Sequence, residues 1–375
     1  MQSPAWLRAA GRPLRDARRH REQLRDARAA WETEWAIERE IEAIVGSAET
    51  VIAGPWLSEV GYETLYWIPF LRWVRQAFRL APERVVAVSR GGVASWYADV
   101  ASRYVEIWDL VEPAEFARRT AERGAVKQQG IADFDRDLVA MVEARLGSAT
   151  SAAAGEGRVA VLHPSLMYRL FAQFWSGHRS LGFLDRHTRH ARMQPGDMAP
   201  AGALPEGYVA VKLYSARSMP DSPGVRRVLR QLVASLAEQA PVVLLDTGLA
   251  LDEHADYELA GGRVVSARAL MTPRTNLGVQ TGIIARARGF VSTCGSLAWM
   301  APMLGTDTSA LYVDPKWLHV HLGVALRAAH KVAAGRFAAC DLRALHPLED
   351  LLSGGGGQAV RAQAGLPAAA EGSGA

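Results

Sequence analysis

Short apolar runs recur along the chain, and each is followed by a stretch of helical character. In the first half they are RVVAVS at 84–89 and RVAVL at 158–162. In the second half they include YVAVKLY at 208–214, PVVLLD at 241–246 and GFVSTC at 289–294. Apolar strands that alternate with helices are typical of a parallel sheet covered by helices on its faces. The sequence therefore predicts an α/β protein.

The alternation is interrupted once, and this interruption divides the chain into two similar halves. A length of 375 residues suits two domains better than one core. We expect two Rossmann-like domains that face each other across a cleft, with an N-terminal helical arm. The expected parts are a basic helical arm at 1–47, an N-terminal domain at 48–176, a Pro-, Gly- and His-rich linker at 177–206, a C-terminal domain at 207–352 and a disordered Gly- and Ala-rich tail at 353–375.

Composition excludes several classes of protein. With 49% hydrophobic and 22% charged residues the chain is typical of a globular protein, and a net charge of +4 is only mildly basic. A nucleic-acid partner is not expected, because no basic stripe interleaved with aromatic residues is visible. The two cysteines, Cys294 and Cys340, lack the spacing of a zinc or disulfide motif. No signal peptide or long apolar run is recognisable, so we expect a cytoplasmic location.

The arm has two interpretations. It is rich in arginine, and Trp31 and Trp35 lie four residues apart, on one face of a helix. Such a helix can lie on an anionic membrane surface or bind a partner. It can equally be a solvated helix that packs on the body through its tryptophans. Asp16, Glu22 and Asp26 interrupt the basic face, which favours the second interpretation.

A candidate anion site follows the strand GFVSTC. There Thr293 and Gly295 lead into a helix that starts at Ser296. Small residues allow the backbone to approach a ligand closely, and free amides at a helix start favour a negative charge. The stretch predicts a cradle for a diphosphate. The alternative is an ordinary strand-to-helix turn with Ser296 as its N-cap.

Two basic residues accompany the strand YVAVKLY. Lys212 lies within it, and Arg217 and Ser218 follow in the next loop. A lysine in an apolar strand is costly unless it is paired, and an arginine forms strong charge-assisted bonds to phosphate. We expect these residues to bind a phosphate group. A surface arginine and a lysine that extends toward water are the alternatives.

Other residues that end strands or begin helices are weaker candidates for the nucleotide or the cleft: Arg90, His163, His254, Asn276 and Gln280. His163 suits a base or a phosphate donor, but it can also be a hydrogen-bonded loop histidine. His178, His187 and His190 lie among arginines, which make a poor cation site, so no metal ligand is predicted.

The order of elements, with the loop GPWLSEVGYE in the first half and the Gly295–Ser296 turn in the second, resembles GT-B-type glycosyltransferases. It is most similar to bacterial heptosyltransferase-related and polysaccharide-cluster enzymes. The resemblance implies an acceptor domain followed by a nucleotide-sugar domain. It implies no metal and no cofactor, since the nucleotide-sugar is a substrate. It also implies phosphate contacts at Lys212, Arg217 and Ser296.

The resemblance further places an acidic base at Glu59 or Glu63. An acidic, glycine-rich donor loop is not evident, which favours an inverting mechanism. One carboxylate would then deprotonate the acceptor hydroxyl while the diphosphate leaves. A glutamate in the first turn of a helix has its pKa lowered by the helix dipole, so Glu59 is preferred to Glu63.

Two alternatives remain open on the same fold. A nucleotide-sugar epimerase would rely more on His163 or His254. A non-catalytic protein would bind a glycan or a partner enzyme without turnover. The expected partners of the transferase are a nucleotide-sugar donor, a glycan or lipid-linked acceptor and, through residues 1–47, the inner face of an anionic membrane.

Overall fold

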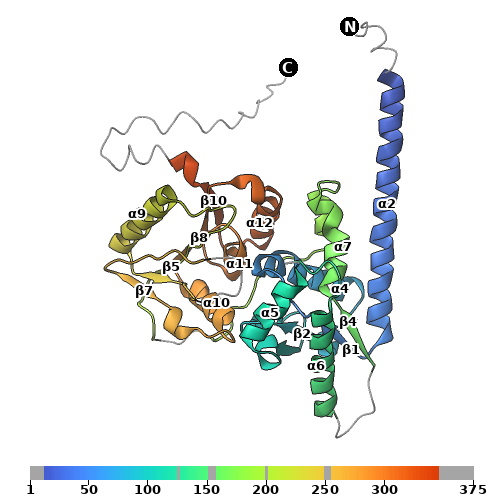
Figure 1. The fold of residues 1–375 in the computed structure, drawn as a ribbon, viewed down its shortest axis with the longest axis horizontal. Coiled ribbons are helices and arrows are strands. Elements are labelled where there is room, and N and C mark those ends of the chain that lie inside the picture. Colours follow the sequence, from blue (N-terminus) through green and yellow to red (C-terminus); the bar gives the residue numbers. More distant parts are fainter. Residues whose placement is uncertain (1–11, 125–126, 151–157, 199–201, 249–254, 346–375) are drawn as a thin grey trace, which may run out of the picture.

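Two parallel sheets, each flanked by helices, form the body of the protein (Figure 1). The computed structural model describes residues 12–124, 127–150, 158–198, 202–248 and 255–345. One sheet lies N-terminal and the other C-terminal to the predicted linker, and all strand pairs within them are parallel. The predicted α/β class with two Rossmann-like domains is thereby confirmed. The predicted tail at 353–375 lies outside the described residues.

The first sheet has the strand order β3-β2-β1-β4. Its strands are β1 (Thr50–Ala53), β2 (Val85–Ser89), β3 (Arg103–Glu106) and β4 (Val159–Leu162). Val51 of the central strand β1 pairs with Val85 on one side and Ala160 on the other. Every residue of β2 is buried. This explains why the strand reads as a continuous apolar run rather than an alternating one.

Helices surround this sheet on both faces. They are α3 (Val60–Tyr62), the π-helical turn η1 (Glu63–Trp67), α4 (Ile68–Ala77), α5 (Pro113–Arg123), α6 (Asp133–Thr150) and α7 (Pro164–Trp175), with the 3-10 turns η2 (Pro82–Arg84), η3 (Ala94–Tyr97) and η4 (Ile107–Asp109). Pro69 follows the π-helical turn without a break in the helix, and the carbonyl of Leu65, four residues earlier, accepts from Nε2 of His190. The helix α8 (Leu181–Arg186) follows within the linker.

The second sheet has the strand order β10-β9-β8-β5-β6-β7. Its strands are β5 (Val209–Lys212), β6 (Val242–Leu244), β7 (Val264–Ser266), β8 (Gly289–Thr293), β9 (Thr308–Tyr312) and β10 (Phe337–Asp341). The chain leaves β5 toward β6 and later returns to β8 on its other side. Ligands of open α/β sheets bind beside such a switch point, at the carboxyl ends of the strands.

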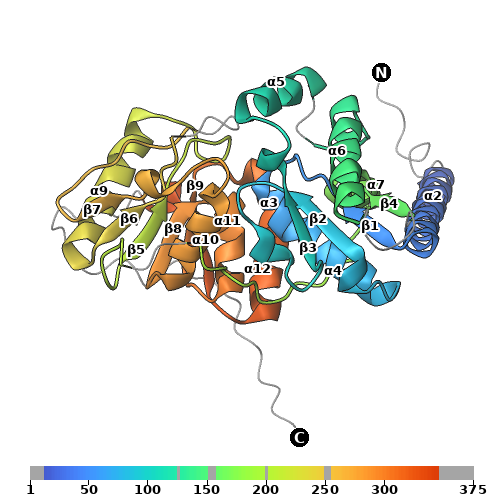
Figure 2. The same cartoon turned by 90° about the horizontal axis from the view of Figure 1, so that it is seen from below.

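The helices of the second domain lie on opposite faces of its sheet (Figure 2). They are α9 (Pro223–Gln239), α10 (Asn276–Arg286), α11 (Ser296–Leu304) and α12 (His319–Val332), with the 3-10 turns η5 (Arg268–Leu270), η6 (Pro315–Trp317) and η7 (Leu342–Leu345). The outer helix α9 has its own apolar cluster with the sheet. The helices α10–α12 belong to a core that continues into the first domain, where α3 packs on α11.

A long helix, α2 (Arg12–Ser47), runs along the outer side of the first domain (Figure 1). The helix packs on the body through buried apolar residues that include Ile37, Ile41 and Val45. The tryptophans do not pack on the body, because Trp31 is 66% and Trp35 54% exposed. The expectation that the arm packs through its tryptophans is therefore wrong. No helix in the described part of the chain is long and apolar enough to cross a membrane.

Candidate functional site

The loop before α3 brings the first domain against the second. Glu59 occupies the N-cap position of α3 and is exposed. Two residues later, Gly61 lies so close to α11 that an added β-carbon would stand 2.8 Å from Cζ3 of Trp299 and 3.1 Å from the amide nitrogen of Ser296. Only glycine permits this approach without a shift of the neighbours. The predicted acidic loop and the predicted helix start are therefore adjacent, although they lie in different domains.

The turn between β8 and α11 has an unusual backbone. Gly295 has a φ of 139°, and Ser296 has a φ of +42°, in the left-handed region that few side chains occupy. Gly295 is the N-cap residue and has no side chain with which to cap the helix. The hydroxyl of Thr293 donates to the carbonyl of Tyr214 at 2.9 Å and accepts from its amide at 3.0 Å. Thr293 thus fixes the turn, and the candidate anion site consists of the helix start at Ser296.

Glu63 has a different environment from Glu59. It is completely buried and accepts hydrogen bonds from Ser89 Oγ at 2.5 Å and from Tyr97 Oη at 2.6 Å. Burial raises its pKa to about 7, although the nearby Arg90 and both hydrogen bonds oppose the shift. The expected lowering by the helix dipole is therefore outweighed by desolvation. The structure therefore shows Glu63 as an internal hydrogen-bond acceptor of Ser89 and Tyr97.

The three phosphate candidates at the end of β5 have different environments. They are Lys212, Arg217 and Ser218. The amine of Lys212 donates to the carbonyl of Leu245 at 3.0 Å and lies 3.3 Å from Oδ1 of Asp256. It therefore ties the end of β5 to the segment around Asp256. Arg217 is exposed and lies over the ring of Trp317, with Cζ 5.1 Å from the ring centroid. Ser218 is buried and contributes its carbonyl oxygen to the loop after β9.

Arg90 and Asn276 stabilise the junction of the domains. Arg90 donates to the carbonyls of Trp56 and Ser58 at 3.0 and 2.8 Å, which fixes the loop that carries Glu59. The glycines after Arg90 donate their amides to Glu106. A β-carbon at Gly91 would stand 2.8 Å from Oδ1 of the buried Asn276. Arg90 and Asn276 therefore help to hold the loops of the candidate site in place.

The remaining candidates are two buried residues and one residue outside the described part of the chain. His163 is buried, accepts from the amide of Ser165 through Nδ1 and faces Asp135 Oδ1 at 3.2 Å through Nε2. It is a hydrogen-bonded structural histidine. Gln280 is 1% exposed, and its Oε1 has no hydrogen-bond partner among the described residues. His254 lies outside the described residues.

One residue at the interface was not predicted from the sequence. His321 of α12 lies between two tyrosines of the first domain, with Nε2 3.0 Å from Tyr62 Oη and Nδ1 2.7 Å from Tyr66 Oη. Burial lowers its pKa to about 4, and the nearby Lys127 adds to this effect. A neutral imidazole has one donor and one acceptor, so one tyrosine donates to it and the other accepts. The ring links the domains beside Glu59.

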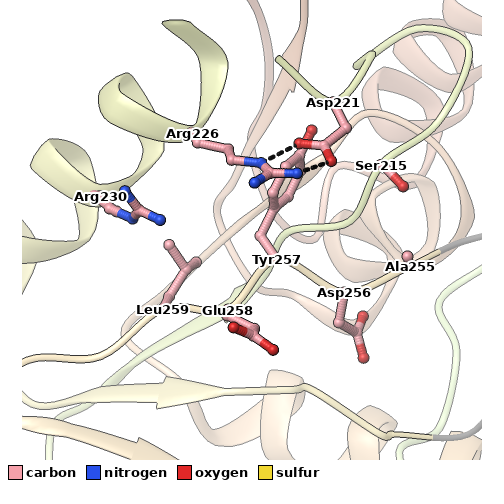
Figure 3. A pocket seen from close by; sticks show the side chains of 9 residues that line it. All are labelled: Ser215, Asp221, Arg226, Arg230, Ala255, Asp256, Tyr257, Glu258 and Leu259. Atoms are coloured by element: carbon pink, nitrogen blue, oxygen red, sulfur yellow. Dashed lines mark hydrogen bonds and ion pairs between the residues drawn. The ribbon is translucent and has the colours of Figure 1, made fainter. Parts of the chain in front are cut away.

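A hollow of about 320 Å³ lies between α9 and neighbouring loops of the second domain (Figure 3). Its lining includes Arg226 and Arg230 from α9 and Tyr257 and Glu258 from the segment before β7. Asp221 pairs with Arg226 at its rim. Ser215 and Asp256 also line it, so the hollow borders the loop after β5 and the Lys212–Asp256 pair.

Three side chains approach each other closely enough to consider a metal ion. Glu34 and Glu38 of α2 and His187 have ligand atoms within 4.8 Å of one another. Arg179 and Arg186, however, already pair with Glu34 at 2.9 and 2.8 Å. A carboxylate held by two guanidinium groups has little charge left for a cation, so the cluster serves as an ion-pair junction between arm and body.

Comparison with known proteins gives matches among solved structures. No protein-family model and no curated protein matches the chain. A family 9 glycosyl transferase from Veillonella parvula DSM 2008 matches 83% of this chain and 91% of its own, at 9% identity and a TM-score of 0.40. The E. coli ADP-heptose LPS heptosyltransferase II matches 71% of this chain and 86% of its own, at 14% identity and a TM-score of 0.38. A Listeria monocytogenes structure described as a UDP-N-acetylglucosamine 2-epimerase matches 82% and 88%, at 9% identity and a TM-score of 0.35.

The expected structural resemblance to heptosyltransferases is therefore found. At identities of 9–14% and TM-scores of 0.35–0.40 it carries no argument about activity. The activity has to follow from the chain's own residues.

Proposed function

We propose that this protein is a glycosyltransferase that moves a sugar from a nucleotide-sugar donor to a hydroxyl group of a glycan or lipid-linked acceptor. One observation carries the proposal. The loop with the exposed carboxylate of Glu59 in one Rossmann-like domain contacts the start of α11 in the other, through Gly61 and Ser296. A group transfer that releases a diphosphate needs a base and an anion-stabilising group on opposite sides of the reacting carbon.

The proposed chemistry follows from these two groups. Glu59 takes the proton of the acceptor hydroxyl as the oxygen attacks the anomeric carbon, and the bond from that carbon to the diphosphate breaks. General base catalysis of this kind contributes about 10²–10⁴-fold to a rate. The amides at the start of α11 and the guanidinium of Arg217 would stabilise the charge that develops on the leaving diphosphate. One base without a covalent intermediate inverts the anomeric configuration.

Metal independence is part of the proposal. Arg217 is exposed at the carboxyl edge of β5, beside the strand that leads to Ser296. These positive groups can supply the charge that a divalent cation supplies in other transferases. A chelator should then leave transfer unchanged, and loss of transfer in the chelator would refute this part.

The epimerase alternative relies on His163 or His254 to reach the sugar. The imidazole of His163 is buried, with a partner at each nitrogen, and His254 lies outside the described residues. Glu59, by contrast, is exposed beside the helix start. A product analysis should find transfer of the sugar to the acceptor. It should find no epimerisation of the donor when the acceptor is absent.

A thermal-shift series with ADP, UDP, GDP and CDP tests whether a nucleotide binds. A ligand at 100 times its dissociation constant should stabilise the protein by about 2.7 kcal/mol. We expect a shift with at least one nucleotide. No shift with any of them, together with no sugar transfer from the corresponding donors, would refute the transferase.

We further propose that the protein works at the inner, cytoplasmic face of an anionic membrane and touches it through the arm. Support comes from one face of α2, where Leu24, Trp31 and Trp35 are 58%, 66% and 54% exposed. Arg21 and Arg28 lie on the same side of the helix by their spacing. Such a mixture of indole rings and arginines suits the headgroup region.

Vesicle flotation tests the membrane contact. Vesicles that contain phosphatidylglycerol should retain the protein, and vesicles of phosphatidylcholine alone should retain much less. The double variant Trp31→Ala/Trp35→Ala should lose the binding while it keeps the unfolding temperature, because both rings are exposed. Equal binding of this variant and the unchanged protein would exclude the proposed face.

A further inference from the structure

An exposed tryptophan with two cations beside it follows the carboxyl end of strand β9 in the second sheet. Trp317 is 47% exposed in the turn η6 after β9. The guanidinium of Arg217 lies 5.1 Å from the centroid of its ring, and the amine of Lys316 lies 5.3 Å from it. Within the described residues no carboxylate forms an ion pair with either cation. Two like charges are thus gathered on one indole.

The two loops that hold these residues are joined by backbone hydrogen bonds. The carbonyl of Ser218, next to Arg217, accepts from the amides of Val313 at 2.7 Å and Asp314 at 3.0 Å. The arrangement of Arg217 against Trp317 is therefore fixed by the backbone and not by the side chains alone. Strand β8 lies between β5 and β9, so the cluster lies at the same sheet edge as the turn at Gly295.

Neighbouring acids leave both cations available. The carboxylate of Asp314 accepts the backbone amide of Lys316 at 2.9 Å. Asp341, at the end of the adjacent strand β10, pairs with Arg343 at 2.6 Å. An indole face attracts cations through its quadrupole, and this attraction restrains two long and flexible side chains. Two restrained positive charges in the open raise the local affinity for an anion.

We propose that Arg217, Lys316 and Trp317 together bind the diphosphate of a nucleoside diphosphate. This inference rests on the proposed transferase function and extends its donor site to the loop after β9. Arg217 and Lys316 donate charge-assisted hydrogen bonds to the phosphate oxygens. Trp317 is a positioning residue that holds the two cations in place. The sequence pattern had suggested only Arg217.

Calorimetric titration of the full-length protein tests the cluster, with inorganic pyrophosphate and with ADP and UDP as separate ligands. Arg217→Gln and Lys316→Gln should each weaken pyrophosphate binding at least about tenfold, because each loses a charge-assisted contact. Trp317→Leu should weaken it by about two- to fivefold, as expected for an exposed cation–π contact, and Trp317→Phe should restore most of the loss. Higher salt should reduce these differences.

Arg226→Gln is the matched control, since Arg226 is an exposed arginine of the same domain that pairs with Asp221. It should bind pyrophosphate like the unchanged protein. Circular dichroism should report equal folding for all variants. Equal pyrophosphate affinity in the Arg217, Lys316 and control variants would overturn the proposal.

The outcome separates this inference from the proposed function. If the cluster variants lose pyrophosphate affinity but the protein transfers no sugar, the diphosphate site stands and the transferase fails. If sugar transfer occurs and the cluster variants bind pyrophosphate normally, the transferase stands and the diphosphate site fails. Tight binding of ADP or UDP that does not respond to Arg217→Gln would also overturn the cluster.

Discussion

The backbone of Gly61 in the first domain touches the amide of Ser296 in the second, leaving room for a hydrogen atom but not for a methyl group. A β-carbon at position 61 would stand 3.1 Å from Ser296 N and 2.8 Å from Trp299. This contact joins the loop of Glu59 to the start of α11. Gly61 is therefore one of the contacts that set the relation between the domains at the proposed site, beside the bonds of His321 to Tyr62 and Tyr66.

Gly61→Ala should disturb this contact. We expect the free energy of unfolding to fall by roughly 1–3 kcal/mol, as for other overpacked positions, because Trp299 and the α11 backbone have to move. Urea denaturation measures the change. Gly46→Ala is the control: a β-carbon there has nothing within 4 Å, and alanine favours the helix, so stability should rise by up to about 1 kcal/mol. Equal effects at the two positions would contradict the proposed contact.

The stability of the protein should depend on pH through Glu63. Its pKa is about 7 in the folded protein and near the ordinary value of 4.5 when unfolded. Between these values the unfolded chain releases a proton that the folded protein keeps, so the contribution of Glu63 to stability is fully present below pH 4.5. This contribution falls as the pH rises from 4.5 through 7, by about 3 kcal/mol in total.

Glu63→Gln isolates this contribution in denaturation curves from pH 4.5 to 8. The variant should lose most of the fall and be more stable than the unchanged protein at pH 8. Glu83→Gln, at an exposed glutamate, should keep the full dependence. An unchanged pH dependence in Glu63→Gln would place the titrating group elsewhere.

Lys212 and Asp256 should behave as an energetically coupled pair. The amine bonds to Leu245 O and Asp256, so Lys212→Met leaves a partly buried carboxylate without its cation. We expect a loss of about 1–3 kcal/mol. Asp256→Asn added to Lys212→Met should recover part of it, and the double-mutant cycle should give a coupling of about 0.5–3 kcal/mol. A lysine that serves only a donor phosphate would instead change nucleotide affinity and leave stability untouched.

The fold was readable from the sequence because its signals are local. The run at 84–89 becomes the fully buried strand β2, and the run at 289–294 leads into β8 and the helix start at Ser296. The turn at Gly295 was also evident, because glycine tolerates the backbone angles that a tight turn between a strand and a helix requires.

The candidate site could be predicted only in part from the sequence, because the side chains that contact each other there are distant in sequence. Lys212 meets Asp256, 44 residues away, and His321 meets Tyr62, 259 residues away. Glu59 and Glu63 are nearly neighbours, yet one is exposed and the other completely buried. No local pattern decides such questions, since they depend on which elements pack together.

The most direct test of the proposed transferase is the release of nucleoside diphosphate from a panel of nucleotide-sugars, measured with purified protein and a hydroxyl acceptor. The unchanged protein should release nucleoside diphosphate from at least one donor and form a glycosylated product. Glu59→Gln should lower that rate by about 10²–10⁴-fold at unchanged donor affinity. An undiminished rate in Glu59→Gln, or no release from any donor, would contradict the role proposed for the carboxylate beside the α11 start.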